Sequence, residues 1–311
     1  MKTGKRIKRI LASAAALAMA ALLSACGRDA DTSSAHDYTY TTLSGAEYSG
    51  TYTGGWEGGQ PNGEGSFSGK GEKGEISLVG TWADGQPNGQ CRRILKTETY
   101  TQTYSGDYFY GEWKGNGNLK VEDTNGDLSI TYDGEFQDDM FNGNGEATYY
   151  YTAEEAVEQG DDRRGYKGMF SNGTKNGEGE LTIYQTAEYA EQYGYDRRVF
   201  KGQFSDDDLT GDVTAIVYYT PKFAEENGGF NCKILTGQYS DNGFVEPYRY
   251  TLYNGNKVLE EGRVTGGKYV SDAEKALNDS IYDGLRAIAG DGILGDLYDI
   301  FAPEIYDRNA E

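Results

Sequence analysis

A fourteen-residue motif recurs along this 311-residue chain and constrains its fold more than any other feature. Each copy has an aromatic residue or leucine, a glycine two positions later, and a second aromatic residue two positions after that. The copies that keep nearly all of the pattern begin at Tyr52 (YTGGWEGGQPNGEG), Leu78, Tyr132, Tyr166 and Phe200. With two degraded copies included, the second aromatic residues are Trp56, Trp82, Trp113, Phe136, Phe170, Phe204 and Tyr239. Self-similarity at intervals of roughly 20 to 50 residues predicts a stacked array of small units.

The motif predicts a β-hairpin whose aromatic face needs its neighbours. In a strand, residues two apart share a face, so Tyr52, Gly54 and Trp56 point the same way. Glycine leaves a slot between the rings, and we expect a ring of the neighbouring hairpin to fill it. Asn-Gly pairs such as Asn62-Gly63 are expected to form the tight reversals. The predicted repeat core comprises Tyr52, Gly54, Trp56, Gly80, Trp82, Trp113, Tyr132, Gly134, Phe136, Tyr166, Gly168, Phe170, Phe200, Gly202, Phe204, Gly237 and Tyr239.

These residues resemble the MORN repeat family, whose consensus is close to YxGxWxxGxxxGxG. The resemblance covers about seven units between residues 48 and 264. It implies an all-β fold, in which stacked hairpins form a single-layer antiparallel sheet, or solenoid. MORN proteins are mostly associated with protein-protein assembly, and lipid binding has been proposed for some of them.

Three later repeats carry an insertion that predicts short helices. Each insertion has a tyrosine, a threonine and then Ala or Pro before a Glu-rich stretch, which is typical of a helix N-cap and first turn. Insertions that recur in register often build the binding surface of a repeat protein. The candidate ligand-binding residues are Tyr151, Tyr189, Tyr193 and Tyr219. Two arginine pairs, 163–164 and 197–198, recur nearby; they would either hold an acidic partner or balance local charge.

The N-terminus predicts export and lipid attachment. Residues 1–25 have the basic stretch, the short apolar run and the small residues of a signal peptide. The sequence Leu23-Ser24-Ala25-Cys26 resembles the bacterial lipobox, which implies that Cys26 carries lipid and anchors the chain to a membrane. We expect residues 26–47, which include His36, to be a flexible tether. The repeat array is assigned to residues 48–267, and a helical cap and tail, with a helix from Ser271, to residues 268–311.

Charge and cysteine usage narrow the range of partners. The chain has a net charge of -21, and removal of the five basic residues before Cys26 gives -21 - 5 = -26. So acidic a chain argues against a nucleic-acid partner. We expect a monomer in which Cys91 and Cys232 remain unpaired.

Enzyme signatures are weak in this sequence. The one histidine lies in the predicted tether, so neither a Ser-His-Asp triad nor a histidine metal site is expected, and no cofactor is predicted. The acidic stretch from Asp123 lacks the later ligands of a calcium loop, so we interpret Asn125-Gly126 as a hairpin turn.

The function expected from the sequence is non-catalytic. We expect an extracytoplasmic, lipid-anchored binding or scaffold protein at a bacterial cell envelope, with a protein partner. The alternative is a cell-wall glycan binder that uses exposed aromatic residues, and a glycan-active enzyme is the third possibility.

Overall fold

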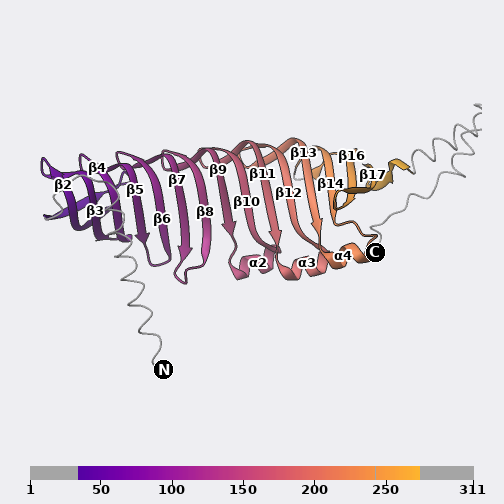
Figure 1. The fold of residues 1–311 in the computed structure, drawn as a ribbon, viewed down its shortest axis with the longest axis horizontal. Helices are drawn as coiled ribbons and strands as arrows, with labels where there is room; N and C mark the ends of the chain where they lie inside the picture. The colour runs from indigo at the N-terminus through magenta and orange to yellow at the C-terminus, as the bar shows by residue number, and fades with distance from the viewer. Residues whose placement is uncertain (1–33, 242, 274–311) are drawn as a thin grey trace, which may run out of the picture. The chain divides into compact units, whose positions relative to one another are not determined.

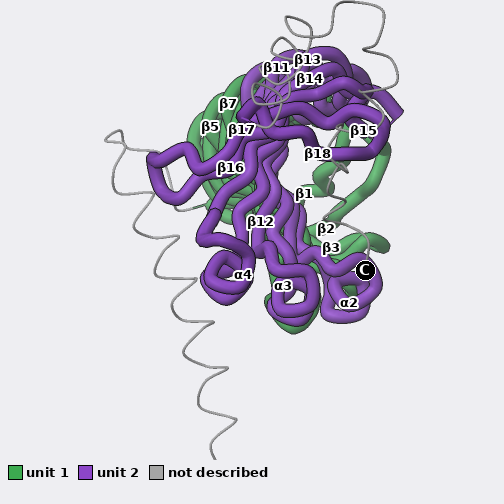
Figure 2. Tube along the Cα trace, turned by 90° about the vertical axis from the view of Figure 1, so that its right-hand side faces the viewer, with its two compact units in different colours: residues 1–140 green, residues 141–311 purple. Residues whose placement is uncertain are grey.

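The computed structural model describes residues 34–241 and 243–273 of the protein. They form antiparallel β-sheet with three short helices, and the chain divides into two compact units (Figures 1 and 2). Unit 1 ends at Met140, and unit 2 begins at Phe141. The all-β class and the antiparallel sheet of repeated hairpins predicted from the sequence are confirmed.

In unit 1 each strand pairs antiparallel with the next one along the chain. Its strands are β1 (Ala35–Thr41), β2 (Glu47–Glu57), β3 (Gln60–Gly71), β4 (Gly74–Ala83), β5 (Gln86–Lys96), β6 (Tyr100–Phe109), β7 (Glu112–Asp123) and β8 (Leu128–Gln137).

The strands of unit 2 also pair antiparallel, and the first of them, β9, begins at Met140, the last residue of unit 1. Its strands are β9 (Met140–Tyr150), β10 (Asp161–Ser171), β11 (Thr174–Gln185), β12 (Tyr195–Ser205), β13 (Asp208–Tyr219), β14 (Cys232–Ser240), β15 (Gly243–Phe244), β16 (Tyr248–Asn254), β17 (Lys257–Thr265) and β18 (Lys268–Ser271).

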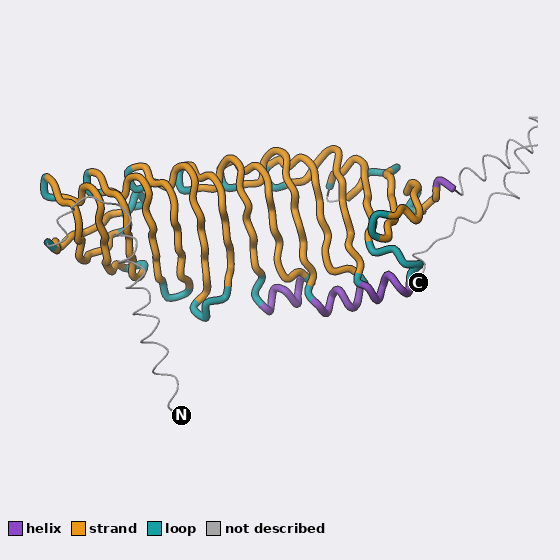
Figure 3. Tube along the Cα trace, viewed as in Figure 1, coloured by secondary structure: helices purple, strands orange, loops and turns teal. Residues whose placement is uncertain are grey.

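The three insertions of unit 2 form the predicted short helices. They are α2 (Ala153–Gln159), α3 (Ala187–Tyr193) and α4 (Pro221–Glu226). Thr152, Thr186 and Thr220 are their N-caps, and each side chain accepts a hydrogen bond from a backbone N–H of the first turn. Within unit 2 the helices lie in a row at one end of the strands, and short turns close the other end (Figure 3).

The tight reversals do not lie where the sequence predicted them. The turn residues are Gly58-Gly59, Asp84-Gly85, Tyr110-Gly111, Asp138-Asp139, Asn172-Gly173 and Asp206-Asp207, and in each pair both residues have positive φ. Two successive positive φ angles define the type I′ turn, whose twist matches that of the flanking strands. The Asn-Gly pairs from which these turns were predicted, such as Asn62-Gly63, lie elsewhere, so that prediction was wrong. Asn125-Gly126, predicted separately, does lie in the turn between β7 and β8.

Asn62-Gly63, Asn88-Gly89 and Asn176-Gly177 instead lie at bulges on the return strands. Gly63 has a φ of 88°, and the pairing of β2 with β3 shifts register between Gly54 and Trp56, opposite this segment. Gly89 and Gly177 also have positive φ and lie in the return strands β5 and β11. Asn-Gly suits both sites because both need positive φ, and sequence alone did not separate them.

In three hairpins the slot at the motif glycines is filled by a tyrosine ring of the same hairpin, whereas a ring of the neighbouring hairpin was expected. A Cβ atom added to Gly65 would lie 2.0 Å from Oη of Tyr52, so the tyrosine covers this glycine across the strand pair. Tyr104 and Tyr166 cover Gly117 and Gly179 in the same way. The ring therefore replaces the side chain that glycine lacks.

The second repeat solves the same packing problem with different residues. Leu78 replaces the first tyrosine of the motif. Cys91, which pairs with Gly80, replaces the last glycine of the motif, which we call the closing glycine. Both Leu78 and Cys91 are buried, and the thiol of Cys91 donates to the Thr81 carbonyl at 3.1 Å. A shorter side chain at 78 leaves the space that the cysteine occupies.

Most predicted core aromatic residues are buried. The buried ones are Tyr52, Trp82, Trp113, Tyr132, Phe136, Tyr166, Phe170 and Phe204. Trp56, Phe200 and Tyr239 are only half-buried. At Phe200 the closing position holds Val213 instead of glycine, and its Cγ2 would be 3.0 Å from a Cβ on Gly202, so the ring cannot lie across that site as Tyr52 does.

Two predicted boundaries differ from the structure. Residues 35–41, expected to be tether, form β1, because Tyr40 is buried and the His36 ring stacks 4.0 Å from that of Trp56. Residues 268–271, expected to begin the helical cap, form β18 and pair with β17. The predicted C-terminal helix beyond them and the lipobox at Cys26 lie outside the described residues.

Candidate binding groove

Seven adjacent strands of unit 2 place one residue each in a single cross-strand row. The residues, in order across the sheet, are Tyr150, Arg163, Tyr184, Arg197, Tyr218, Cys232 and Tyr253. Because paired residues share a face of the sheet, these side chains line up on one side. We call this row the tyrosine-arginine ladder.

The arginines of the ladder pack against its tyrosines. The guanidinium carbon of Arg163 lies 4.0 Å from the ring centroid of Tyr184, and that of Arg197 lies 4.1 Å from the ring centroid of Tyr218. Such stacking orients the planar guanidinium and leaves its edge for hydrogen bonds.

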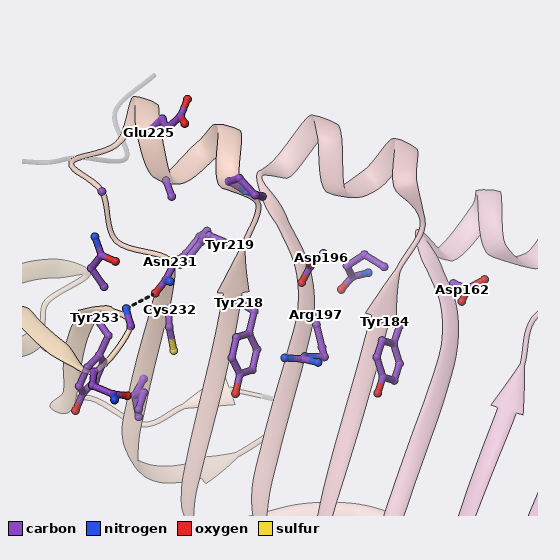
Figure 4. Close-up of a pocket in the computed structure, with 18 of the residues that line it drawn as sticks. Asp162, Tyr184, Asp196, Arg197, Tyr218, Tyr219, Glu225, Asn231, Cys232 and Tyr253 are labelled. Carbon is purple, nitrogen blue, oxygen red and sulfur yellow. Dashed lines mark hydrogen bonds between the residues drawn. The ribbon is translucent and has the colours of Figure 1, made fainter.

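A groove of about 1260 Å³ follows the ladder (Figure 4). Its floor includes Tyr184, Arg197, Tyr218 and Cys232, and α4 contributes Glu225 to its wall. Figure 4 shows Arg197 between Tyr184 and Tyr218 on adjacent strands. The groove is mixed in charge, since Asp162 and Asp196 line it with the arginines.

The second arginine of each recurring pair lies on the opposite face and balances a buried charge. Asp161 is 1% exposed, and its Oδ2 accepts hydrogen bonds from Nε and Nη2 of Arg164 at 2.9 and 2.5 Å. Its Oδ1 accepts from Gln185 at 2.6 Å, and Nη2 of Arg198 lies 3.7 Å away. Register shifts after Asp161 and Tyr195 allow this arrangement, because each bulge reverses the alternation of faces.

The four predicted ligand-binding tyrosines have different surroundings. Tyr219 lines the groove and stacks 4.8 Å from Phe223. Tyr151 lies 5.5 Å from the guanidinium carbon of Arg164, on the face opposite the groove. Tyr189 accepts a hydrogen bond from the Tyr195 hydroxyl at 3.1 Å, and Tyr193 packs 4.2 Å from Tyr189. Only Tyr219 of the four lines the groove.

The tyrosines of the ladder were not among the candidate site residues predicted from the sequence. Tyr150, Tyr184 and Tyr218 recur at equal intervals, each just before an insertion, and the arginine pairs recur at the same interval. That periodicity could have identified the row. It could not show which arginine of each pair faces the groove, because the bulges decide this.

The helices of the insertions are joined to one another through glycines. Tyr189 of α3 packs on Gly160, the C-cap of α2, and Phe223 of α4 packs on Gly194, the C-cap of α3. Thr186 and Thr220 donate backbone hydrogen bonds to the carbonyls of these glycines at 2.9 and 2.8 Å. The row of helices is thus continuous with the wall of the groove.

Replacing Gly160 with alanine is expected to destabilise unit 2 by about 2–4 kcal/mol. The residue has a φ of 71°, and a Cβ atom would lie 2.1 Å from Cδ2 of Tyr189. Gly228→Ala is the matched control, because Gly228 has a φ of 82° but no atom within 4 Å of its Cβ position. The control should lower the free energy of unfolding by only about 1 kcal/mol. Both values would be measured by urea unfolding followed by far-UV circular dichroism. Equal costs would show that the tyrosine contact is not important.

The two described cysteines are unpaired and chemically different. Burial raises the pKa of Cys91 to about 12, so its thiol stays protonated near neutral pH. Burial also raises the pKa of Cys232, and the nearby Arg197 charge opposes that shift. Cys232 is half-buried in the groove.

Fold and groove together define a repeat protein of β-hairpins with a polar, tyrosine-lined groove. The family model for the MORN repeat matches residues 52–71, 79–97, 132–150 and 166–184. The copies around Trp113 and Phe204 lie outside these segments but form the same paired hairpins. MORN repeats are generally associated with protein binding and scaffolding. Comparison with curated proteins found no match.

Within residues 34–241 and 243–273, no helix is long and apolar enough to cross a bilayer.

Proposed function

We propose that this chain is a lipid-anchored, extracytoplasmic scaffold that binds a protein segment in the groove of unit 2. The observation that carries the proposal is the tyrosine-arginine ladder, which lines an open groove with oriented guanidinium and phenol groups. Buried aromatic residues and arginine are the residue types that contribute most to protein interfaces. The general association of MORN repeats with protein binding supports the same role.

The groove is suited to binding rather than to catalysis. Its one thiol, Cys232, has a raised pKa, which lowers the fraction of reactive thiolate near neutral pH. The one histidine, His36, lies in unit 1, where its ring stacks on Trp56. We therefore propose a non-enzymatic function.

Cross-linking from the groove tests the binding role. A photoreactive phenylalanine analogue would replace Tyr253, which lines the groove, and in a control would replace Phe109, which is exposed in unit 1. Irradiation of intact cells should give one reproducible protein adduct from position 253 and not from position 109. Absence of any protein adduct from the groove would contradict the proposed function.

Fractionation of cells tests the anchor. Cys26→Ala should move the protein from the membrane fraction to the soluble fraction, because the lipid attachment site is removed. Cys232→Ala is the control, because it removes a thiol but leaves the lipobox intact. Membrane retention of the Cys26→Ala protein would rule out anchoring through this residue.

A further inference from the structure

Two Asp-Arg pairs at equivalent positions line the groove. They differ in whether the aspartate and the arginine form an ion pair with each other. Asp162 and Arg163 lie on β10, and Asp196 and Arg197 occupy the matching positions on β12. In the first pair, Nη1 of Arg163 donates to Oδ2 of Asp162 at 2.6 Å. In the second pair, no such ion pair forms between the two side chains.

Arg197 retains unused hydrogen-bonding capacity. Among the described residues, its side chain has no hydrogen-bond acceptor and no ion-pair partner, and its Nε is shielded from solvent without an acceptor. Its guanidinium packs on the face of Tyr218 at 4.1 Å. A shielded donor without an acceptor is unfavourable, and a carboxylate is the acceptor that fits a guanidinium best, through two parallel hydrogen bonds.

The wall beside Arg197 carries negative charge that is also unpaired. Asp196 and Glu225 line the groove, both are exposed, and neither has an ion pair or side-chain hydrogen bond within the described part of the chain. A ligand that offered only negative charge would be repelled by them. A ligand that places a cationic group near these carboxylates and a carboxylate at Arg197 would match both charges.

We infer that the groove recognises a peptide segment in which an acidic residue stands next to a basic residue. The inference rests on the proposed protein-binding function and names the chemistry of the partner. The acidic side chain binds the Arg197 guanidinium, and the basic side chain lies toward Asp196 and Glu225. The Asp162-Arg163 pair neutralises itself and contributes less to this recognition.

A cell-wall glycan fits the groove less well. Carbohydrate rings bind aromatic residues by stacking on a free ring face. In the ladder, Arg163 covers one face of Tyr184, and Arg197 covers one face of Tyr218. The surface thus offers hydrogen-bond donors along the row rather than open aromatic platforms.

Selection from a random library of twelve-residue peptides tests the inference. The target is the full chain after the signal peptide, with Cys26→Ser, and parallel selections use Arg197→Gln and Arg163→Gln proteins that keep the wild-type circular dichroism spectrum. Wild-type protein should enrich peptides with Asp or Glu beside Lys or Arg. The Arg197→Gln protein should lose that enrichment, and the Arg163→Gln protein should keep it.

Binding of one selected peptide is then measured to determine how much its acidic residue and Arg197 contribute to affinity. Fluorescence anisotropy should show at least tenfold weaker binding when its acidic residue is changed to the amide, and Arg197→Lys should restore only part of the loss to Arg197→Gln. The inference is overturned if no peptide is selected, if selected peptides lack the acidic residue, or if purified wall polysaccharide binds the groove instead. A groove adduct in cells that persists in Arg197→Gln protein would overturn the inference alone and leave the proposed function intact.

Discussion

Replacing Asp161 with alanine is expected to lower the free energy of unfolding of unit 2 by about 2–3 kcal/mol. The carboxylate is almost fully buried and accepts hydrogen bonds from Arg164 and Gln185, with Arg198 nearby. Its removal leaves the cationic side chains without their shared counterion, which costs more than the net contribution of the pair itself. Asp161→Asn should cost less, because the amide keeps an acceptor oxygen.

The neighbouring carboxylate is the matched control for this effect. Asp162 is half exposed, with a side-chain exposure of 53%, and pairs with Arg163 at the surface. Asp162→Ala should therefore cost about 1 kcal/mol or less. Equal destabilisation by the two variants would contradict the idea that the buried network across β10, β11 and β12 stabilises unit 2.

The readout must report on unit 2. All three tryptophans, at positions 56, 82 and 113, lie in unit 1, so tryptophan fluorescence follows unit 1. Hydrogen exchange measured on peptides from residues 161–205 would follow unit 2 directly. Loss of protection in those peptides, with unit 1 unchanged, is the expected result.

The tyrosine and the closing glycine of a repeat are expected to behave as one coupled pair. Gly65→Cys should destabilise unit 1 by about 2–3 kcal/mol, because the new Cβ atom meets the Tyr52 ring. Tyr52→Leu alone should cost about 2 kcal/mol, since a buried ring is lost. The Tyr52 hydroxyl has no hydrogen-bond partner in the described part of the chain, so the loss is one of packing.

The double variant copies the natural second repeat, where Leu78 and Cys91 occupy these positions. Tyr52→Leu with Gly65→Cys should therefore cost about 1–3 kcal/mol less than the sum of the single variants. The exchange in the second repeat, Leu78→Tyr with Cys91→Gly, should show coupling of the same sign. Trp56 and Trp82 lie 5.9 and 5.3 Å from the Tyr52 ring, so their fluorescence during denaturant unfolding measures the effect.

If the destabilisation of the double variant equals the sum for the two single variants, the ring and the glycine do not share one site. Gly59→Ala provides the reference for a glycine change without steric contact, because nothing lies within 4 Å of its Cβ position. It should cost about 1 kcal/mol, from the left-handed backbone alone.

Local chemistry was enough to predict the hairpins and the helices. The alternation of aromatic residues and glycine has the period of a strand, and the threonine caps act within one turn of helix. Both depend on neighbours in the sequence, which explains why the fold class and α2, α3 and α4 were predicted correctly. The strand at residues 35–41 was missed because its stability comes from rings on other strands, through Tyr40 and His36.

The groove depended on pairing that the sequence did not reveal. The recurrence of Tyr184, Tyr218 and the arginine pairs was visible along the chain, but the bulges after Asp161 and Tyr195 decide which arginine faces the groove. A bulge is an extra residue on one strand relative to the strand it pairs with. Its position therefore depends on the pairing of both strands.

Sequence alone established the repeat, its period and the threonine caps of its helices, because each depends on residues a few positions apart. Tertiary structure decided which ring covers which glycine, which carboxylate is buried and which guanidinium is left without an acceptor. Those outcomes depend on residues brought together across strands, as Arg197 and Tyr218 are, so only the paired sheet could show them.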